Sequence, residues 1–138
     1  MTRSASLAVA IALSLAGCGC EGRSFTLTRS GSEIATGCAE VASTAAARTA
    51  GLSGRAPLEE GHAMWLEFPM VTEACITNGP VSFDIDVAYL SPDGTVRSVE
   101  RRFPAGDRTP RCHDGAQHVI EWNSANAPPV RVDDRVIW

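Results

Sequence analysis

Two carboxylates separated by one residue are the first side chains whose type and spacing could support chemistry. Asp84 and Asp86 lie in the alternating segment 81–90, and residues two apart on a strand share one face, about 7 Å from each other. Such a pair could hold a cation or act as acid and base in a hydrolysis. The apolar residues of this segment fall on the opposite face, which favours a simpler interpretation. Both carboxylates then mark the solvent side of a half-buried strand.

Two further side chains could contact a ligand. His113 could carry a proton or bind a metal, although a lone histidine in a loop is more often merely solvated. Arg55 ends the sequence Gly-Leu-Ser-Gly-Arg, where it could contact a ligand or, more simply, bind backbone carbonyl groups. The sequence lacks the H-E-x-x-H, C-x-x-C, phosphate-loop and G-x-S-x-G patterns, which carry known catalytic or metal chemistry. We therefore predict no catalytic residue, no metal site and no cofactor.

The N-terminus has the pattern of an export signal. One positive charge, Arg3, precedes the mostly apolar residues 5–15, a run too short to span a bilayer. The exit Leu-Ala-Gly-Cys at 15–18 resembles the lipobox of bacterial lipoproteins, which implies cleavage before Cys18 and acylation of that residue. A plain signal peptide is the alternative. Gly19 follows the anchor instead of the aspartate of an inner-membrane retention signal, so we expect a cell-envelope protein held by lipid in the outer membrane and facing the periplasm.

Four cysteines remain once Cys18 is assigned to the anchor. They are Cys20, Cys38, Cys75 and Cys112. An exported chain meets an oxidising compartment, where an even number of cysteines suggests two disulfides with three possible connectivities. We prefer the pairs Cys20–Cys38 and Cys75–Cys112, and buried free thiols remain the alternative.

Length and charge limit the architecture and the partners. The 138 residues suffice for one domain. We divide them into a lipoprotein signal peptide at 1–17, a lipidated stem at 18–32 and a single β domain at 33–138. The net charge of −4 argues against nucleic acid as a partner, because binding phosphates requires a basic face. The expected partners are the membrane, through Cys18, and a saccharide or another envelope protein.

The hydrophobic pattern predicts a mainly β fold. Residues 81–90 alternate strictly, and the turn Ser-Pro-Asp-Gly at 91–94 leads to a returning strand at 95–103. Shorter candidates follow at 117–122 and 130–138. An alanine-rich stretch after Ser43 and Thr44 predicts one short helix at about 43–51. We expect a small sandwich or distorted barrel of short antiparallel strands.

Several motifs together resemble a known family. In chain order they are Val41-Ala42-Ser43-Thr44, Gly51-Leu52-Ser53-Gly54-Arg55, Ala63-Met64-Trp65-Leu66-Glu67-Phe68, Asp86-Val87-Ala88-Tyr89-Leu90 with Asp93-Gly94, Val119-Ile120-Glu121-Trp122-Asn123 and Asp133-Asp134-Arg135-Val136. This ordered set is similar to the signature of the domain of unknown function 192 family. The resemblance implies a compact, mostly β domain with one short helix, often exported and without an established activity.

One segment departs from that family pattern. The family's F-W-M-K-N-T motif should lie between Phe68 and Asp86, but this chain has Cys75-Ile-Thr-Asn-Gly-Pro there. Aligning Asn78 with the family's asparagine leaves two extra residues before Asp86. Neither the tryptophan nor the lysine is present in either register. Counting back from Asp86 without gaps places Pro80 at the family's asparagine instead. If this motif forms a ligand surface in the family, this chain has lost or changed it, and Asn78 is kept as a possible ligand-binding residue.

Two hypotheses about function follow. The first is an exported lipoprotein that acts as a non-catalytic envelope module and binds a ligand or partner. The alternative is a metal-dependent or carboxylate-based hydrolase acting on a cell-envelope saccharide, with Asp84, Asp86 and a histidine in its site. The hydrolase requires those side chains to converge in a concave pocket.

Overall fold

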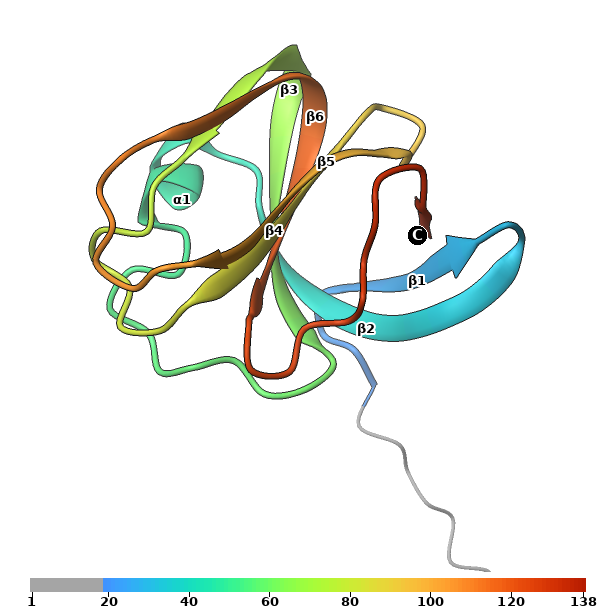
Figure 1. Ribbon diagram of the computed structural model, residues 1–138, viewed down its shortest axis with the longest axis horizontal. Helices are drawn as coiled ribbons and strands as arrows, with labels where there is room; N and C mark the ends of the chain where they lie inside the picture. Colours follow the sequence, from blue (N-terminus) through green and yellow to red (C-terminus); the bar gives the residue numbers. More distant parts are fainter. Residues whose placement is uncertain (1–18) are drawn as a thin grey trace, which may run out of the picture.

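The computed structural model describes residues 19–138, which form one curved, seven-stranded sheet and one short helix (Figure 1). The predicted signal peptide and Cys18 lie outside the described residues. The elements are β1 (Arg23–Arg29), β2 (Ser32–Ala42), α1 (Ala45–Ala50), β3 (His62–Ile76), β4 (Ile85–Leu90), β5 (Val96–Phe103), β6 (Arg111–Asn123) and β7 (Arg135–Ile137). Their order in the sheet is β5-β4-β6-β3-β2-β1-β7. The prediction of a mainly β fold with one short helix is confirmed.

The sheet is mixed and strongly curved. All its strand pairs are antiparallel except β2 with β3, so the expectation of antiparallel strands fails for that one pair. The connection between β2 and β3 contains α1, and a crossover of this length allows parallel pairing. The sheet is not closed, but its two edges meet at one isolated bridge between Thr95 and Arg135. Curvature of this kind lets one sheet enclose apolar residues on both faces.

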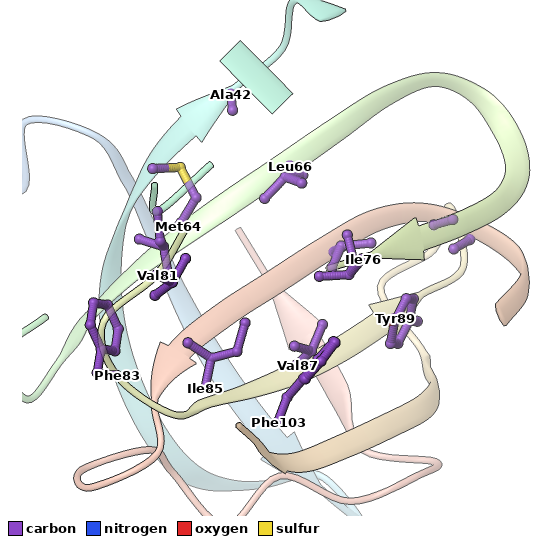
Figure 2. Packing of buried hydrophobic residues seen from close by; sticks show 14 residues of the cluster. Ala42, Met64, Leu66, Ile76, Val81, Phe83, Ile85, Val87, Tyr89 and Phe103 are labelled. Carbon is purple, nitrogen blue, oxygen red and sulfur yellow. The ribbon is translucent and has the colours of Figure 1, made fainter. Parts of the chain in front are cut away.

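Two hydrophobic cores lie on opposite faces of the sheet. The helix-side core contains Leu66, Ile85 and Tyr89 together with Leu52 after α1, and Figure 2 shows how its side chains converge. The other core is built around Trp65 and includes residues of β1, β2, β6 and β7. Because β4 is covered on both faces, every one of its residues is buried. The prediction that this strand is half-buried was therefore wrong.

The sheet begins earlier in the chain than the sequence suggested. Part of the predicted stem, residues 23–29, forms β1 and pairs with both β2 and β7. Phe25 and Leu27 point into the second core and are buried. Their apolar side chains alternate with serine, threonine and arginine, as is typical of a strand that is buried on one face. Because most residues of this segment are polar, it was predicted to be a stem.

The helix α1 is short because the residues on either side of it favour the beginning and the end of a helix. The Thr44 hydroxyl accepts a hydrogen bond from the backbone N–H of Ala47, which caps the first turn. Gly51 follows the last turn with φ of 45° and ψ of −126°, a conformation that favours glycine. The helix predicted at about 43–51 is thus present in its central part.

Two disulfides fasten the sheet. Cys20 pairs with Cys38, and Cys75 pairs with Cys112, which is the connectivity preferred from the sequence. The second disulfide joins residues directly opposite each other on β3 and β6. Within residues 19–138, no helix is both long and apolar enough to cross a membrane.

Candidate functional site

The paired carboxylates of the sequence do not form a catalytic pair. Asp86 is buried and accepts hydrogen bonds from the backbone N–H of Arg102 at 3.0 Å and the hydroxyl of Ser124 at 2.6 Å. Arg101 lies 3.3 Å from its other oxygen. Asp84 precedes β4, is exposed, and accepts a bond from the backbone N–H of Ala105. Both carboxylates therefore hold the ends of strands and loops, and neither hydrogen-bonds a histidine in the described residues.

His113 belongs to an ion-pair cluster beside β5. Its Nε2 lies 2.9 Å from a carboxylate oxygen of Glu100, and the other oxygen of Glu100 accepts from Arg111 at 3.0 Å. The histidine ring also packs on Tyr89, with 4.5 Å between ring centroids. The cluster joins β5 to β6 and contains neither of the two aspartates. The convergence that the hydrolase hypothesis required is absent from residues 19–138.

Arg55 has a surface partner. It forms a bidentate pair with Glu40, in which both side chains are exposed. The hydrogen bonds from Arg55 lower the pKa of Glu40 below its ordinary value. The pair connects the turn after α1 to β2, and an exposed pair of this kind contributes about 1 kcal/mol or less to stability. We assign Arg55 a structural role.

Asn78 is the candidate residue that the structure places at a cavity. It is fully buried in the loop between β3 and β4, and its amide nitrogen lies 3.0–3.1 Å from three backbone carbonyl oxygens. Those carbonyls belong to Phe83, Phe103 and Pro104. Its amide oxygen has no hydrogen-bond partner among residues 19–138. A buried amide oxygen without a partner is costly and calls for an explanation.

The cavity that Asn78 lines has a volume of about 250 Å³. It lies between the end of α1, the end of β3 and the last residues of β6, on the helix side of the sheet. The residues of its wall that matter here are Arg48, Gly51, Leu52, Asn78, Val81 and Glu121. A larger hollow of about 920 Å³ lies beside the Cys20–Cys38 disulfide. None of the buried ionisable side chains lines that hollow, so the smaller cavity is the better candidate site.

Glu121 is the most unusual side chain of this cavity. It occupies β6 between Met64 of β3 and Val87 of β4, and its side chain enters the helix-side core, where it is 4% exposed. Burial raises the pKa of its carboxyl to about 7, and no hydrogen bond or ion pair within the described residues opposes that shift. A carboxylate in this position is expensive to keep ionised.

Glycine at position 51 leaves space beside this carboxyl. A Cβ atom there would lie 3.8 Å from a carboxyl oxygen of Glu121. The positive φ of Gly51 also disfavours any other residue. The end of α1 thus lies close to the carboxyl group of Glu121.

Arg48 lines the cavity but does not neutralise Glu121. Its guanidinium donates hydrogen bonds to the backbone carbonyls of Ser43 and Glu67. It also lies over the ring of Phe68, 5.0 Å from the centroid. These contacts keep the guanidinium of Arg48 beside β3. Burial alone therefore accounts for the raised pKa of Glu121.

A family model decides the classification of the chain. The DUF192 model, described as uncharacterized ACR, matches residues 26–138. The chain belongs to the DUF192 family. No curated protein matches it.

Two solved structures share the fold of this DUF192 chain. A protein of unknown function from Novosphingobium aromaticivorans is 20% identical, with a TM-score of 0.72 over 83% of this chain and 84% of that one. A protein from Sinorhizobium meliloti, named "a putative transcription regulator", is 18% identical, with a TM-score of 0.77 over 83% of this chain and 91% of that one. At these identities the likeness establishes the fold alone.

A signal for Glu121 is present in the sequence, although Glu121 was not among the predicted site residues. In this DUF192 chain the glutamate interrupts the apolar run Val119-Ile120-Glu121-Trp122. A strand buried on both faces reads as a continuous apolar run, so an acidic residue within it is expected to be buried. The alternating spacing of Asp84 and Asp86 resembled a functional pair and favoured those residues instead.

Proposed function

We propose that this DUF192 protein is a lipid-anchored module of the cell envelope that binds a small polar ligand in the cavity at Glu121, without catalysing a reaction. The export signal, the lipobox-like Cys18 and the two disulfides support the location. The observation that carries the binding proposal is a buried carboxyl that opens on a cavity and has no partner among residues 19–138. Functional sites are where such unpaired, strongly perturbed groups concentrate.

The proposed anchor leaves the cavity accessible. In Figure 1 the described chain begins beside β1 and β2, whereas α1, which borders the cavity, lies on the other side of the molecule. A lipid attached at Cys18 would therefore fix the domain near the membrane through its β1 side. The cavity could then exchange a ligand with the surrounding compartment.

The hydrolase alternative has one observation in its favour. A carboxyl whose pKa is about 7 has the property that a general acid needs near neutral pH. Glycoside hydrolases, however, commonly use two carboxyl groups that flank the scissile bond. Among the described residues that line this cavity, Glu121 is the only acidic one, so binding is the function that the geometry supports better.

A ligand screen tests the binding proposal. Full-length protein in detergent, with its disulfides intact, would be melted in the presence of saccharides, small amines and divalent metal ions. A ligand at about one hundred times its dissociation constant adds about 2.7 kcal/mol to stability, which produces a clear rise in melting temperature. We expect at least one ligand to give this rise in wild-type protein and in Glu33→Gln, an exposed control, but not in Glu121→Gln. Equal shifts in all three proteins would place the binding elsewhere.

Acylation of Cys18 can be tested independently of any ligand. We expect wild-type protein to incorporate labelled palmitate and to enter the detergent phase in a two-phase extraction. Cys18→Ser should lose both properties, because no other residue has the lipobox context. Cys20→Ser is the matched control, since it alters a neighbouring cysteine and its disulfide but leaves the anchor. Full labelling of Cys18→Ser would contradict the proposed anchor.

A further inference from the structure

We propose that the cavity at Glu121 binds the alkylammonium group of a compact ligand, with the Glu121 carboxylate as its counter-ion. This inference rests on the proposed ligand-binding function and specifies the chemistry of the ligand. It follows from the hydrogen-bonding groups of the cavity, from its charge and from its size.

The ionised carboxyl of Glu121 offers acceptors and no donors to a ligand, and Asn78 in the same cavity wall has no free N–H group to offer. The two N–H groups of Asn78 are already committed to backbone carbonyls, whereas its oxygen has no partner in the described part of the chain. An ionised carboxyl accepts hydrogen bonds but donates none. A ligand that pairs with Glu121 must therefore bring donors, and an ammonium group brings three and accepts none.

The charge of the cavity favours a cationic donor over a neutral one. Glu121 and Arg48 are the charged residues among the described residues of its wall, and the guanidinium of Arg48 is held by Ser43, Glu67 and Phe68. A hydroxyl ligand would leave the carboxylate uncompensated, whereas an ammonium would pair with it. The net charge of −4 also attracts cations to the protein.

The face of strand β4 that borders the helix-side core adds no competing charge. Asp86, the charged residue of β4, lies on the other face, where Arg101, Arg102 and Ser124 bind it. Tyr89 of β4 lies in the same helix-side core as the Glu121 side chain. Its phenol is neutral at physiological pH, and burial raises its pKa further above the ordinary value of 10. The carboxylate of Glu121 therefore remains the charge that a ligand must balance.

The size of the cavity restricts the ligand to a small molecule or a single side chain. Its volume of about 250 Å³ is below the range of about 300–1,000 Å³ that is typical of sites for drug-sized ligands. Leu52 and Val81 provide an apolar wall for the methylene groups that carry the amine. The chain contains no lysine, so another copy of this protein cannot supply an alkylammonium side chain. The occupant is either a free amine or an amine-bearing side chain of another molecule.

A matched pair of probes separates the ammonium from the hydroxyl. 1,4-Diaminobutane and 1,4-butanediol share a carbon skeleton and differ in the groups at its ends. Nα-acetyl-L-lysine amide represents an amine on a peptide, in contrast to the free diamine. Binding to full-length protein in detergent would be measured by calorimetry at pH 6 and pH 8, with Glu121→Gln and the control Glu33→Gln beside the wild type.

We expect an amine to bind the wild type and Glu33→Gln, and the diol to bind at least tenfold more weakly. Because the ammonium pairs with the ionised form of Glu121, and alkylammonium groups stay charged at both pH values, affinity should rise about tenfold from pH 6 to pH 8. Glu121→Gln should weaken amine binding at least tenfold and remove this pH dependence. Tighter binding of the diamine would indicate a free amine as the ligand, and tighter binding of the lysine amide would indicate an amine-bearing side chain of another molecule.

Other outcomes overturn the inference in distinguishable ways. Equal binding of diol and diamine, lost in Glu121→Gln, would refute the ammonium but retain a ligand site at Glu121. Absence of binding by both amines would also refute the ammonium, and the wider ligand screen would then decide the proposed function. Amine binding that Glu121→Gln leaves unchanged would contradict both the inference and the proposed site.

Discussion

Replacing Ile85 with aspartate is expected to abolish cooperative folding of the domain. Ile85 is 1% exposed and lies in β4, between β5 and β6, with its side chain in the helix-side core (Figure 2). No arginine is among the buried residues of the described chain, so the new carboxylate would be buried without a buried basic partner. Such burial costs several kcal/mol, which is comparable to the whole stability of a typical domain, about 5–15 kcal/mol.

Circular dichroism and tryptophan fluorescence during heating would measure this loss. Met70→Asp is the matched control, because it introduces the same charge at a side chain that is 68% exposed. We expect the control to melt close to the wild type and Ile85→Asp to show no cooperative transition. A wild-type melting curve for Ile85→Asp would contradict the burial of β4 between β5 and β6.

Glu121→Gln is expected to stabilise the ligand-free protein at alkaline pH. The folded-state pKa of Glu121 is raised to about 7 from its ordinary value of 4.5, so the folded state binds a proton more tightly than the unfolded state does. Wild-type stability therefore falls as the pH rises from about 4.5 through 7. A difference of this size corresponds to about 3 kcal/mol once both states are ionised. Glutamine has a similar shape and no charge, so the variant escapes this loss.

Denaturant unfolding between pH 5 and pH 8 would test the sign of this effect. We expect the free energy of unfolding of Glu121→Gln, relative to that of the wild type, to increase by about 2 kcal/mol from pH 5 to pH 8. Asp134→Asn provides a control whose difference from the wild type should stay constant over this interval, because hydrogen bonds from Arg29 lower the pKa of Asp134 below its ordinary value of 3.8, so its contribution changes only at lower pH. Asp134 stabilises the fold above its unfolded-state pKa, and this contribution is lost as the pH falls. A constant difference between wild type and Glu121→Gln would contradict the burial of an unpaired carboxyl.

Local patterns predicted the elements of this fold better than their burial. The alternation around Ile85 and the capping residue Thr44 each identified an element, because strand and helix periodicity are local properties. The burial of β4 on both faces depends instead on contacts with residues far along the chain. The alternation of apolar with small or polar residues in 81–90 suggested a solvent-exposed face instead. Asp86 is nevertheless buried, because it accepts hydrogen bonds from Arg102 and Ser124.

The candidate site was predictable only in part. Asn78 was identified through the family resemblance, and it does line the cavity. The apolar run around Glu121 indicates that it is buried, but Glu121 was missed as a site residue because its place at a cavity depends on the position of β6 between β3 and β4 and on the loop and helix beyond them. His113 was a candidate because of its residue type and Arg55 because of its place in the Gly-Leu-Ser-Gly-Arg turn, yet each has an ionic partner from a distant segment.

The titration of Glu121 itself is the most direct test of the proposed site. Carbon-13 NMR of glutamate carboxyl groups in the full-length protein would follow each group with pH, and the signal lost in Glu121→Gln would assign the residue. We predict a midpoint at about pH 7 without ligand and a lower midpoint when an amine is bound. A midpoint near the ordinary value of 4.5 would contradict the proposal, because it would mean that Glu121 is solvated or paired and that the cavity does not hold an uncompensated carboxyl.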